Sequence, residues 1–156
     1  MNRDHRSPGP RYQALLQLLR TAETLWNASR IFFGRWNLSP SQFNVLNLLY
    51  GQPAGCTQIE LSRQLIMHRS NVTGLIDRLE ARHLVARLED DTDRRIYRVV
   101  LTPAGRKLVG EILPHYYRAA DRVWAGVSSK PASRLRVELQ RISQNAEQVA
   151  QQTVPP

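Results

Sequence analysis

The sequence predicts a mainly α-helical fold in which a helix-turn-helix and a β-hairpin lie between long terminal helices. Three observations predict it. Apolar residues recur every three or four positions along most of the chain. A single stretch, residues 84–101, changes to short β-branched runs around a charged loop. Ser39, Thr57 and Thr102 each precede such an apolar pattern, as helix-capping residues do.

Two helices are expected before residue 51. The first runs from about Arg11 to Phe33, and Gly34 is expected to end it. Its apolar positions at helical spacing are Leu15, Leu18, Leu19, Ala22, Leu25 and Trp26. The second runs from about Ser39 to Tyr50, because Ser39 suits an N-cap and Pro40 suits the first helical turn.

The middle of the chain predicts two shorter helices joined by a turn. The first spans about Thr57 to Leu65, and Thr57 with Glu60 has the spacing of a capping box. The second runs from Arg69 or Ser70 to Ala81. One side of it carries an apolar stripe formed by Val72, Leu75, Ile76 and Leu79.

A hairpin and two long helices are expected to complete the chain. The strands are Leu84–Leu88 and Ile96–Leu101, joined by a polar loop. Thr102 and Pro103 then start a long helix, in which Pro114 is expected to cause a kink. The last helix is expected to begin at residues 130–131.

The charge of the chain favours an anionic partner. The 156 residues carry a formal net charge of +9, with a pI near 10.8, which favours nucleic acid or, less often, a membrane surface. Lys107 and Lys130 are the only lysines, and arginine can bind phosphate or guanine through two hydrogen bonds. A bias toward arginine can equally reflect genomic composition, so both interpretations stay open.

Several classes of protein are disfavoured. Cys56 is the single cysteine, which excludes an intrachain disulfide and fits a reducing cytoplasm. No apolar run approaches the ~18 residues of a membrane span, and the first ten residues lack the apolar core of a signal peptide. The four histidines are scattered, so neither a metal nor a cofactor is expected. No nucleophile or phosphate-loop motif is present, so the sequence predicts no enzyme.

The outer face of the helix near residues 69–81 suggests contact with DNA. Ser70, Asn71 and Thr73 are short polar groups that can approach base edges. Arg69 and Arg78 can bind phosphate or reach a guanine. At the hairpin tip, Arg94 and Arg95 could enter the minor groove. An apolar stripe with a polar outer face also describes most surface helices, so the ordered combination is the more specific signal.

The stretch from Leu38 to Gly105 resembles the multiple-antibiotic-resistance-regulator (MarR) family. The similar segments are Leu38–Phe43, Val45–Leu46, Ser70–Glu80, Leu84–Val85, Asp90–Arg95 and Val99–Gly105. Within them, Asp93, Arg95 and Val99 match the signature of the family's wing, which is its β-hairpin.

The resemblance implies a winged helix-turn-helix and a homodimer. Residues 1–36 would form an arm and a dimerisation helix, 37–101 the DNA-binding region, and 102–156 further dimerisation helices. Two recognition helices would contact a palindromic operator with half-sites ~34 Å apart. The residues implied to contact double-stranded DNA are Arg69, Ser70, Asn71, Thr73, Arg78, Arg94 and Arg95. Asp93 would orient the wing arginine or attach the wing to the body.

Two residues depart from the family pattern. Gly74 stands where many relatives have Arg or Lys, which removes one expected DNA contact; close approach of DNA or of a neighbouring helix is the alternative explanation. His83 stands where the family usually has a glycine that ends the helix; a left-handed histidine is possible there but less favourable than glycine.

The resemblance also implies control by a small molecule. Many relatives release DNA when an aromatic or phenolic effector binds. The resemblance therefore implies that this chain is a ligand-responsive repressor. The candidate ligand-binding residues here are Trp26, Arg30, Phe33, Trp36, Phe43 and Tyr116. The alternative is that these aromatic residues pack the core or the dimer interface. Cys56 precedes a helix, a position that can lower a thiol pKa, so oxidation sensing is a second possibility.

Two further functions stay open at this stage. The chain could be a small-molecule-binding protein, or an RNA-binding winged-helix module without operator specificity. Stacking aromatic residues on the outer face would favour RNA, and none occurs between Thr57 and Ile96.

Overall fold

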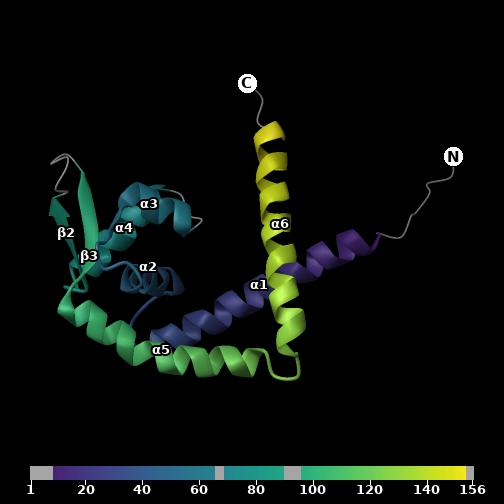
Figure 1. The fold of residues 1–156 in the computed structure, drawn as a ribbon, viewed down its shortest axis with the longest axis horizontal. Helices are drawn as coiled ribbons and strands as arrows, with labels where there is room; N and C mark the ends of the chain where they lie inside the picture. The colour runs from purple at the N-terminus through teal and green to yellow at the C-terminus, as the bar shows by residue number, and fades with distance from the viewer. Residues whose placement is uncertain (1–8, 66–68, 90–95, 154–156) are drawn as a thin grey trace. The chain divides into compact units, whose positions relative to one another are not determined.

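The fold is that of a computed structural model, which describes residues 9–65, 69–89 and 96–153, and only the backbone path at 69, 70, 129 and 130. Its elements are α1 (Pro10–Gly34), α2 (Pro40–Tyr50), β1 (Cys56–Thr57), α3 (Gln58–Gln64), α4 (Arg69–Glu80), β2 (Val85–Glu89), β3 (Tyr97–Leu101), α5 (Pro103–Val123) and α6 (Ser129–Thr153) (Figure 1). They form two compact units, Met1–Glu111 and Ile112–Pro156, and α5 contributes to both. The predicted mainly helical fold with a small hairpin is confirmed.

Side-chain caps start the helices where the sequence places them. The Ser39 hydroxyl accepts a hydrogen bond from the Gln42 backbone N–H, and the Gln42 side chain accepts one from the Ser39 N–H, at 3.2 and 2.8 Å. The same reciprocal pair joins Thr57 and Glu60. Thr102 accepts from the Gly105 N–H at 3.0 Å. These bonds satisfy N–H groups that the first helical turn leaves without partners.

Helix α1 ends at Gly34, but a residue other than Gly34 reverses the chain there. Gly34 is the last helical residue, but its backbone does not have a positive φ. The chain continues as a turn to Asn37, which adopts the left-handed conformation at φ 54°. Asparagine tolerates this region better than most residues, so Asn37 rather than Gly34 reverses the chain. His83, after α4, likewise has φ 54°, so it adopts the left-handed conformation that the sequence left possible for it.

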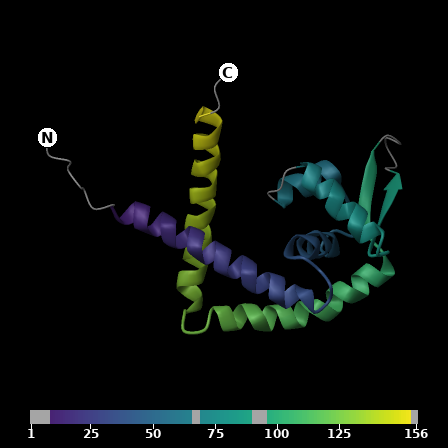
Figure 2. The same ribbon diagram turned by 180° about the vertical axis from the view of Figure 1, so that it is seen from behind.

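A three-stranded sheet in the order β1-β3-β2 accompanies the helices of the first unit (Figures 1 and 2). Both pairings are antiparallel, with Cys56 opposite Val99 and Arg87 also opposite Val99 on the other side. The two-residue strand β1 was not predicted, because it is too short to show a period. The core beneath contains fully buried side chains of α1, α2, α3, α4 and β3: Phe33, Phe43, Val45, Leu46, Leu49, Leu61, Val72, Ile76, Leu79 and Val99.

The second unit contains the end of α5 and all of α6. The α5 helix continues past Pro114 to Val123, and the kink expected there stays a prediction. Helix α6 exposes many large apolar side chains, including Leu135, Val137, Ile142 and Val149. None of the helices in the described ranges is both long and apolar enough to cross a membrane.

The start of α5 lies directly against the residue before β2. A Cβ atom built on Gly105 would come within 2.0 Å of the Leu84 carbonyl oxygen, which belongs to the backbone and cannot rotate away. Gly105 is buried, and only a residue without a side chain allows this approach.

We therefore expect Gly105→Ala to lower the free energy of unfolding by about 2 kcal/mol or more, through forced displacement of packed backbone. Urea unfolding followed by circular dichroism measures it. Gly110→Ala is the matched control, because its Cβ would meet only the Tyr50 hydroxyl at 3.8 Å. The control should gain roughly 0.5–1 kcal/mol from helix propensity. Equal stability of the two variants would contradict the close approach.

Candidate nucleic-acid interface

Helix α4 has one buried and one exposed side. Val72, Ile76 and Leu79 are fully buried, and Leu75 is 5% exposed. The opposite side presents exposed Asn71, Thr73, Asp77 and Arg78. Burial of the apolar stripe fixes the rotation of the helix, so the polar side chains face outward. This is the geometry that a helix needs in order to enter a DNA major groove.

The other candidate DNA contacts are only partly described. Arg69 and Ser70 lie in the first turn of α4, and nothing is described of their side chains. Asp93, Arg94 and Arg95, the wing residues, lie outside the described residues. A Cβ built on Gly74 would meet only the Arg78 guanidinium, at 3.6 Å. Because this is an ordinary contact distance, nothing in the described chain requires glycine there, and a neighbouring helix does not explain it.

The base of the hairpin is attached to α4 by an arginine that sequence analysis missed. The Arg87 guanidinium, on β2, forms ion pairs with the Asp77 and Glu80 carboxylates of α4. The Arg87 backbone N–H also donates to Glu80 at 3.2 Å. Burial acts to lower the pKa of Arg87, but the hydrogen bonds and charges of Asp77 and Glu80 outweigh it and raise that pKa. Arg87 therefore fixes the hairpin on the helix and neutralises an exposed carboxylate.

A second arginine holds the other strand of the hairpin. Arg98, on β3, donates to the backbone carbonyls of Ala54 and Gly55 at 3.0 and 2.8 Å. Its guanidinium also lies 3.8 Å from the Glu60 carboxylate of α3. Both hairpin strands are thus attached to the helix-turn-helix through arginine side chains.

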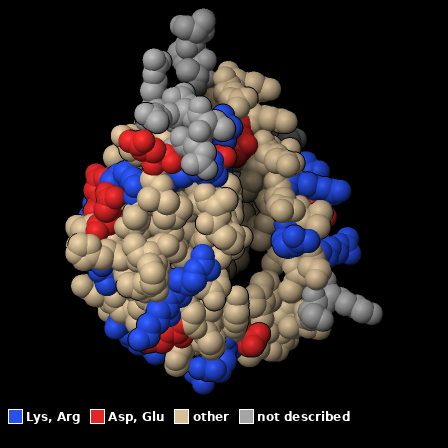
Figure 3. Space-filling view, turned by 60° about the vertical axis from the view of Figure 1, so that its left-hand side comes forward, with Lys and Arg blue, Asp and Glu red and all other residues tan. Residues whose placement is uncertain are grey.

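The charged side chains form no single basic patch on the face drawn in Figure 3. Lys and Arg side chains are scattered there among uncharged residues, and Asp and Glu lie beside several of them. Residues 55–101 contain eight Arg against seven Asp or Glu, so a balanced distribution is expected. Placement by the fold, rather than bulk charge, must therefore direct any DNA contact.

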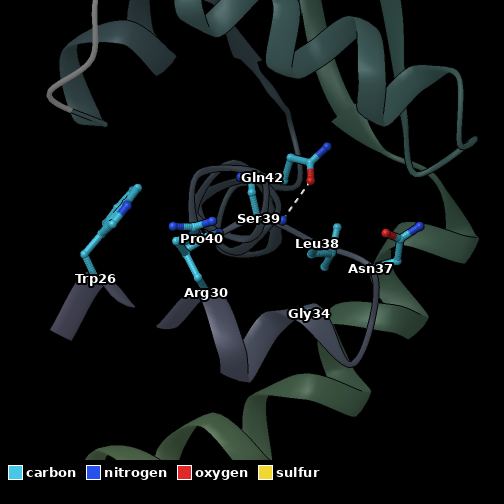
Figure 4. Close-up of a pocket in the computed structure, with 8 residues that line it drawn as sticks. All are labelled: Trp26, Arg30, Gly34, Asn37, Leu38, Ser39, Pro40 and Gln42. Atoms are coloured by element: carbon cyan, nitrogen blue, oxygen red, sulfur yellow. Dashed lines mark hydrogen bonds between the residues drawn. The ribbon is translucent and has the colours of Figure 1, made fainter. Parts of the chain in front are cut away.

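A pocket of about 400 Å³ lies beside the junction of α1 and α2 (Figure 4). Trp26 and Arg30 of α1 contribute to its wall, as two of the six candidate ligand-binding residues. The remaining lining residues are Gly34, Asn37, Leu38, Ser39, Pro40 and Gln42. The pocket therefore offers an indole and a guanidinium against a mostly small and polar wall.

Three other candidate ligand-binding residues have different surroundings. Phe33 and Phe43 are buried and stack with ring centroids 4.2 Å apart, so they pack the core and do not line this pocket. The Trp36 indole N–H donates to the Glu111 carboxylate at 3.0 Å. Periodicity could not separate core aromatics from pocket aromatics, because both lie on the same side of a helix.

Tyr116, the last of the candidate ligand-binding residues, belongs to the second unit. Its contribution to a ligand site stays a prediction. In the parts of the chain that the structure describes, no three His, Cys, Asp or Glu side chains gather as metal ligands do.

Cys56 is a buried residue of β1, and its thiol donates to the Gln52 side-chain carbonyl at 2.7 Å. Burial, followed by the Glu60 carboxylate, raises the pKa of the thiol, while Arg98 acts to lower it. The lowered pKa considered from its position before α3 is therefore wrong, because burial and the Glu60 carboxylate together outweigh Arg98.

Comparison with known proteins places these features in a family. The sequence model of the protein family described as the MarR family matches residues 36–96 of this chain. The chain is 32% identical over 96 residues to the uncharacterised HTH-type transcriptional regulator YsmB of Bacillus subtilis (strain 168), covering 62% of this chain and 65% of that protein. It is 30% identical over 109 residues to the HTH-type transcriptional regulator FarR of Neisseria gonorrhoeae, covering 68% and 74%. The match thus spans just under two thirds of YsmB.

Solved structures show the same fold over more of the chain. BpsR of Bordetella bronchiseptica, whose DNA binding is described as regulated by 6-hydroxynicotinic acid, matches with a TM-score of 0.76 and 29% identity. The match covers 88% of this chain and 98% of that one. CouR of Rhodococcus jostii RHA1, bound to p-coumaroyl-CoA, matches with a TM-score of 0.79, 26% identity and coverage of 87% and 95%.

The raised pKa of Cys56 predicts an unreactive thiol. Because less thiolate exists at any pH below a raised pKa, and because the sulfur is buried, alkylation should be slow. Iodoacetamide at pH 8 should modify the folded protein at least about tenfold more slowly than the urea-unfolded protein. Mass spectrometry measures both rates, and similar rates would restore Cys56 as a candidate sensor.

Proposed function

This chain belongs to the MarR family, and from that premise we propose that it is a sequence-specific DNA-binding transcriptional regulator. In this proposal it is a homodimeric repressor of a palindromic operator. One observation carries the proposal: α4 buries Val72, Ile76 and Leu79 and exposes Asn71, Thr73 and Arg78. An outward row of short polar side chains with an arginine on the next turn suits base edges and phosphates in a major groove.

The wing would supply the second contact with DNA. Arg87 and Arg98 hold the two strands of the hairpin against α4 and the turn before β1. A hairpin fixed in this way would carry Arg94 and Arg95 to a constant place beside α4. Arginine is suited to the narrow minor groove, where the negative potential is strongest. Asp93 would orient these arginines. Arg69 and Ser70, near the start of α4, would contact the sugar-phosphate backbone of the DNA.

Exposed apolar side chains support a homodimer. In α1, Leu15, Leu19 and Ile31 are 48%, 59% and 78% exposed, and α6 exposes Ile142 and Val149 by 44% and 62%. Soluble monomers rarely leave so many large apolar residues on long helices in water. A second copy of the same chain would cover them. It would also present a second α4, as a palindromic site requires.

The pocket supports control by a small aromatic effector with an acidic group. Trp26 offers a flat apolar surface and Arg30 a cation on the next turn of α1. The volume of the pocket, about 400 Å³, falls within the range of about 300–1,000 Å³ typical of small-molecule sites. Two structural relatives are described with aromatic ligands, 6-hydroxynicotinic acid and p-coumaroyl-CoA. Binding here would release the operator.

A gel-shift titration tests the proposed function. The protein should bind duplex DNA from the promoter region upstream of its own gene. At about 150 mM salt, the affinity should exceed that for a scrambled duplex by roughly a thousandfold. Single-stranded RNA of the same sequence is the control for an RNA-binding module. Equal affinity for the natural and scrambled duplexes, or preference for the RNA, would contradict the proposal.

Asn71→Ala should relax base preference within each half-site. If the Asn71 amide contacts a base edge, its loss removes about 1–3 kcal/mol of discrimination at one base pair. Titration against duplexes substituted at each position measures this. Asn47→Ala, at an exposed asparagine of α2, is the matched control and should change nothing. A uniform loss of affinity across all duplexes would make Asn71 a phosphate contact instead.

A further inference from the structure

Arg82, in the turn after α4, binds a distant turn of the chain. Its Nη1 donates to the Asn37 carbonyl oxygen at 2.6 Å, and its Nη2 donates to the Trp36 carbonyl oxygen at 3.2 Å. Both acceptors lie in the turn that follows α1, and all three residues belong to the first unit. The guanidinium therefore spans two successive carbonyls in the fixed forked geometry that distinguishes arginine from lysine.

The structure of the turn explains why it accepts this side chain. Asn37 is left-handed, and its N–H donates to Gly34 O at 3.0 Å, while the Leu38 N–H donates to Phe33 O at 3.2 Å. These bonds close the end of α1 and leave the carbonyls of Trp36 and Asn37 directed toward Arg82. Carbonyl groups at a helix C-terminus carry partial negative charge, which favours a cation there.

The same turn forms part of the pocket wall. Asn37 and Leu38 of this turn line the pocket together with Gly34, the last residue of α1, and Figure 4 shows Trp26 and Arg30 earlier on that same helix. Asn37 is thus both a lining residue of the pocket and the residue whose backbone carbonyl accepts a hydrogen bond from Arg82. The Arg82 side chain therefore joins a residue that lines the pocket to the turn that ends α4.

The other end of the contact is built firmly into α4. After Arg82, the His83 N–H donates to Glu80 O at 2.8 Å and the Leu84 N–H donates to Leu79 O at 3.0 Å. The Thr102 hydroxyl also donates to His83 O at 2.6 Å. Because these bonds allow little local movement, displacement of Arg82 would move or loosen the end of α4 itself.

We infer that Arg82 is the positioning residue that couples the pocket beside Asn37 to the DNA-contacting helix α4. The inference rests on the proposed function, since it assigns a route by which an effector would change DNA binding. It predicts that filling the pocket alters α4 only while the Arg82 side chain joins the two turns.

The test fills the pocket without needing its natural ligand. A Cβ built on Gly34 meets nothing within 4 Å, and this residue lines the pocket, so Gly34→Cys should be tolerated. Benzyl methanethiosulfonate then attaches an aromatic ring to the introduced thiol. Cys56 is buried, and mass spectrometry confirms that a single label is present. Gly51→Cys is the matched control, because Gly51 is exposed and does not line the pocket.

Hydrogen exchange of the amides of residues 81–84 gives the readout, and it requires no DNA. Labelling at position 34 should change their exchange rates at least about fivefold when Arg82 is present, and less than about twofold in the Arg82→Ala background. Arg82→Lys, which keeps the charge but loses the fork, should give an intermediate change. It also serves if Arg82→Ala does not fold. Labelling at position 51 should leave the exchange rates of residues 81–84 unchanged in both backgrounds.

Two results would overturn the inference: equal changes with and without the Arg82 side chain, or no change in either background. Operator affinity of the unlabelled protein is measured separately. If the unlabelled protein had no affinity for an operator, the proposed function would be rejected. The exchange data would still decide whether Arg82 couples the pocket to α4.

Discussion

Burial of one side of α4 is the constraint on which the rest of this structure depends. Val72, Ile76 and Leu79 are completely removed from water, so rotation of the helix by even one position would expose apolar surface and bury a polar group. The outward direction of Asn71 and Arg78 is a consequence of that burial. The direction of the surface proposed to contact base edges is thus set by burial of the core side chains.

Arginine has two separate uses in this chain. Arg82, Arg87 and Arg98 each bind groups within the first unit: backbone carbonyls of the turns after α1 and α2, and the carboxylates of Asp77, Glu80 and Glu60. The ion pairs involve three of the seven acidic residues in 55–101, a stretch that is nearly balanced in charge although the chain as a whole is strongly basic. The internal arginines attach the hairpin and the turn after α4 to neighbouring segments, so the proposed contacts with phosphate would fall to other arginines.

Features encoded locally could be predicted from the sequence, and features set by tertiary contact could not. The capping boxes at Ser39 and Thr57 and the stripe of α4 involve residues three or four positions apart, so their spacing shows them. Arg82 and Asn37 are 45 positions apart, and no period links them. Phe33 and Phe43 are aromatic, as the residues of a ligand pocket often are, and only their burial and mutual stacking in the fold show that they belong to the core.

The strength of the contact between Arg82 and the turn limits how strongly a pocket ligand could affect DNA binding through it. Hydrogen bonds to charged groups contribute about 1.5–3 kcal/mol each, and less when partly exposed to solvent as here. A ligand shifts an equilibrium only by its difference in affinity for the two states. Loss of one such bond therefore corresponds to roughly a tenfold change in operator affinity, within the range of about 5–150-fold typical of allosteric coupling. A larger response would require the α1–α2 junction or the dimer to change as well.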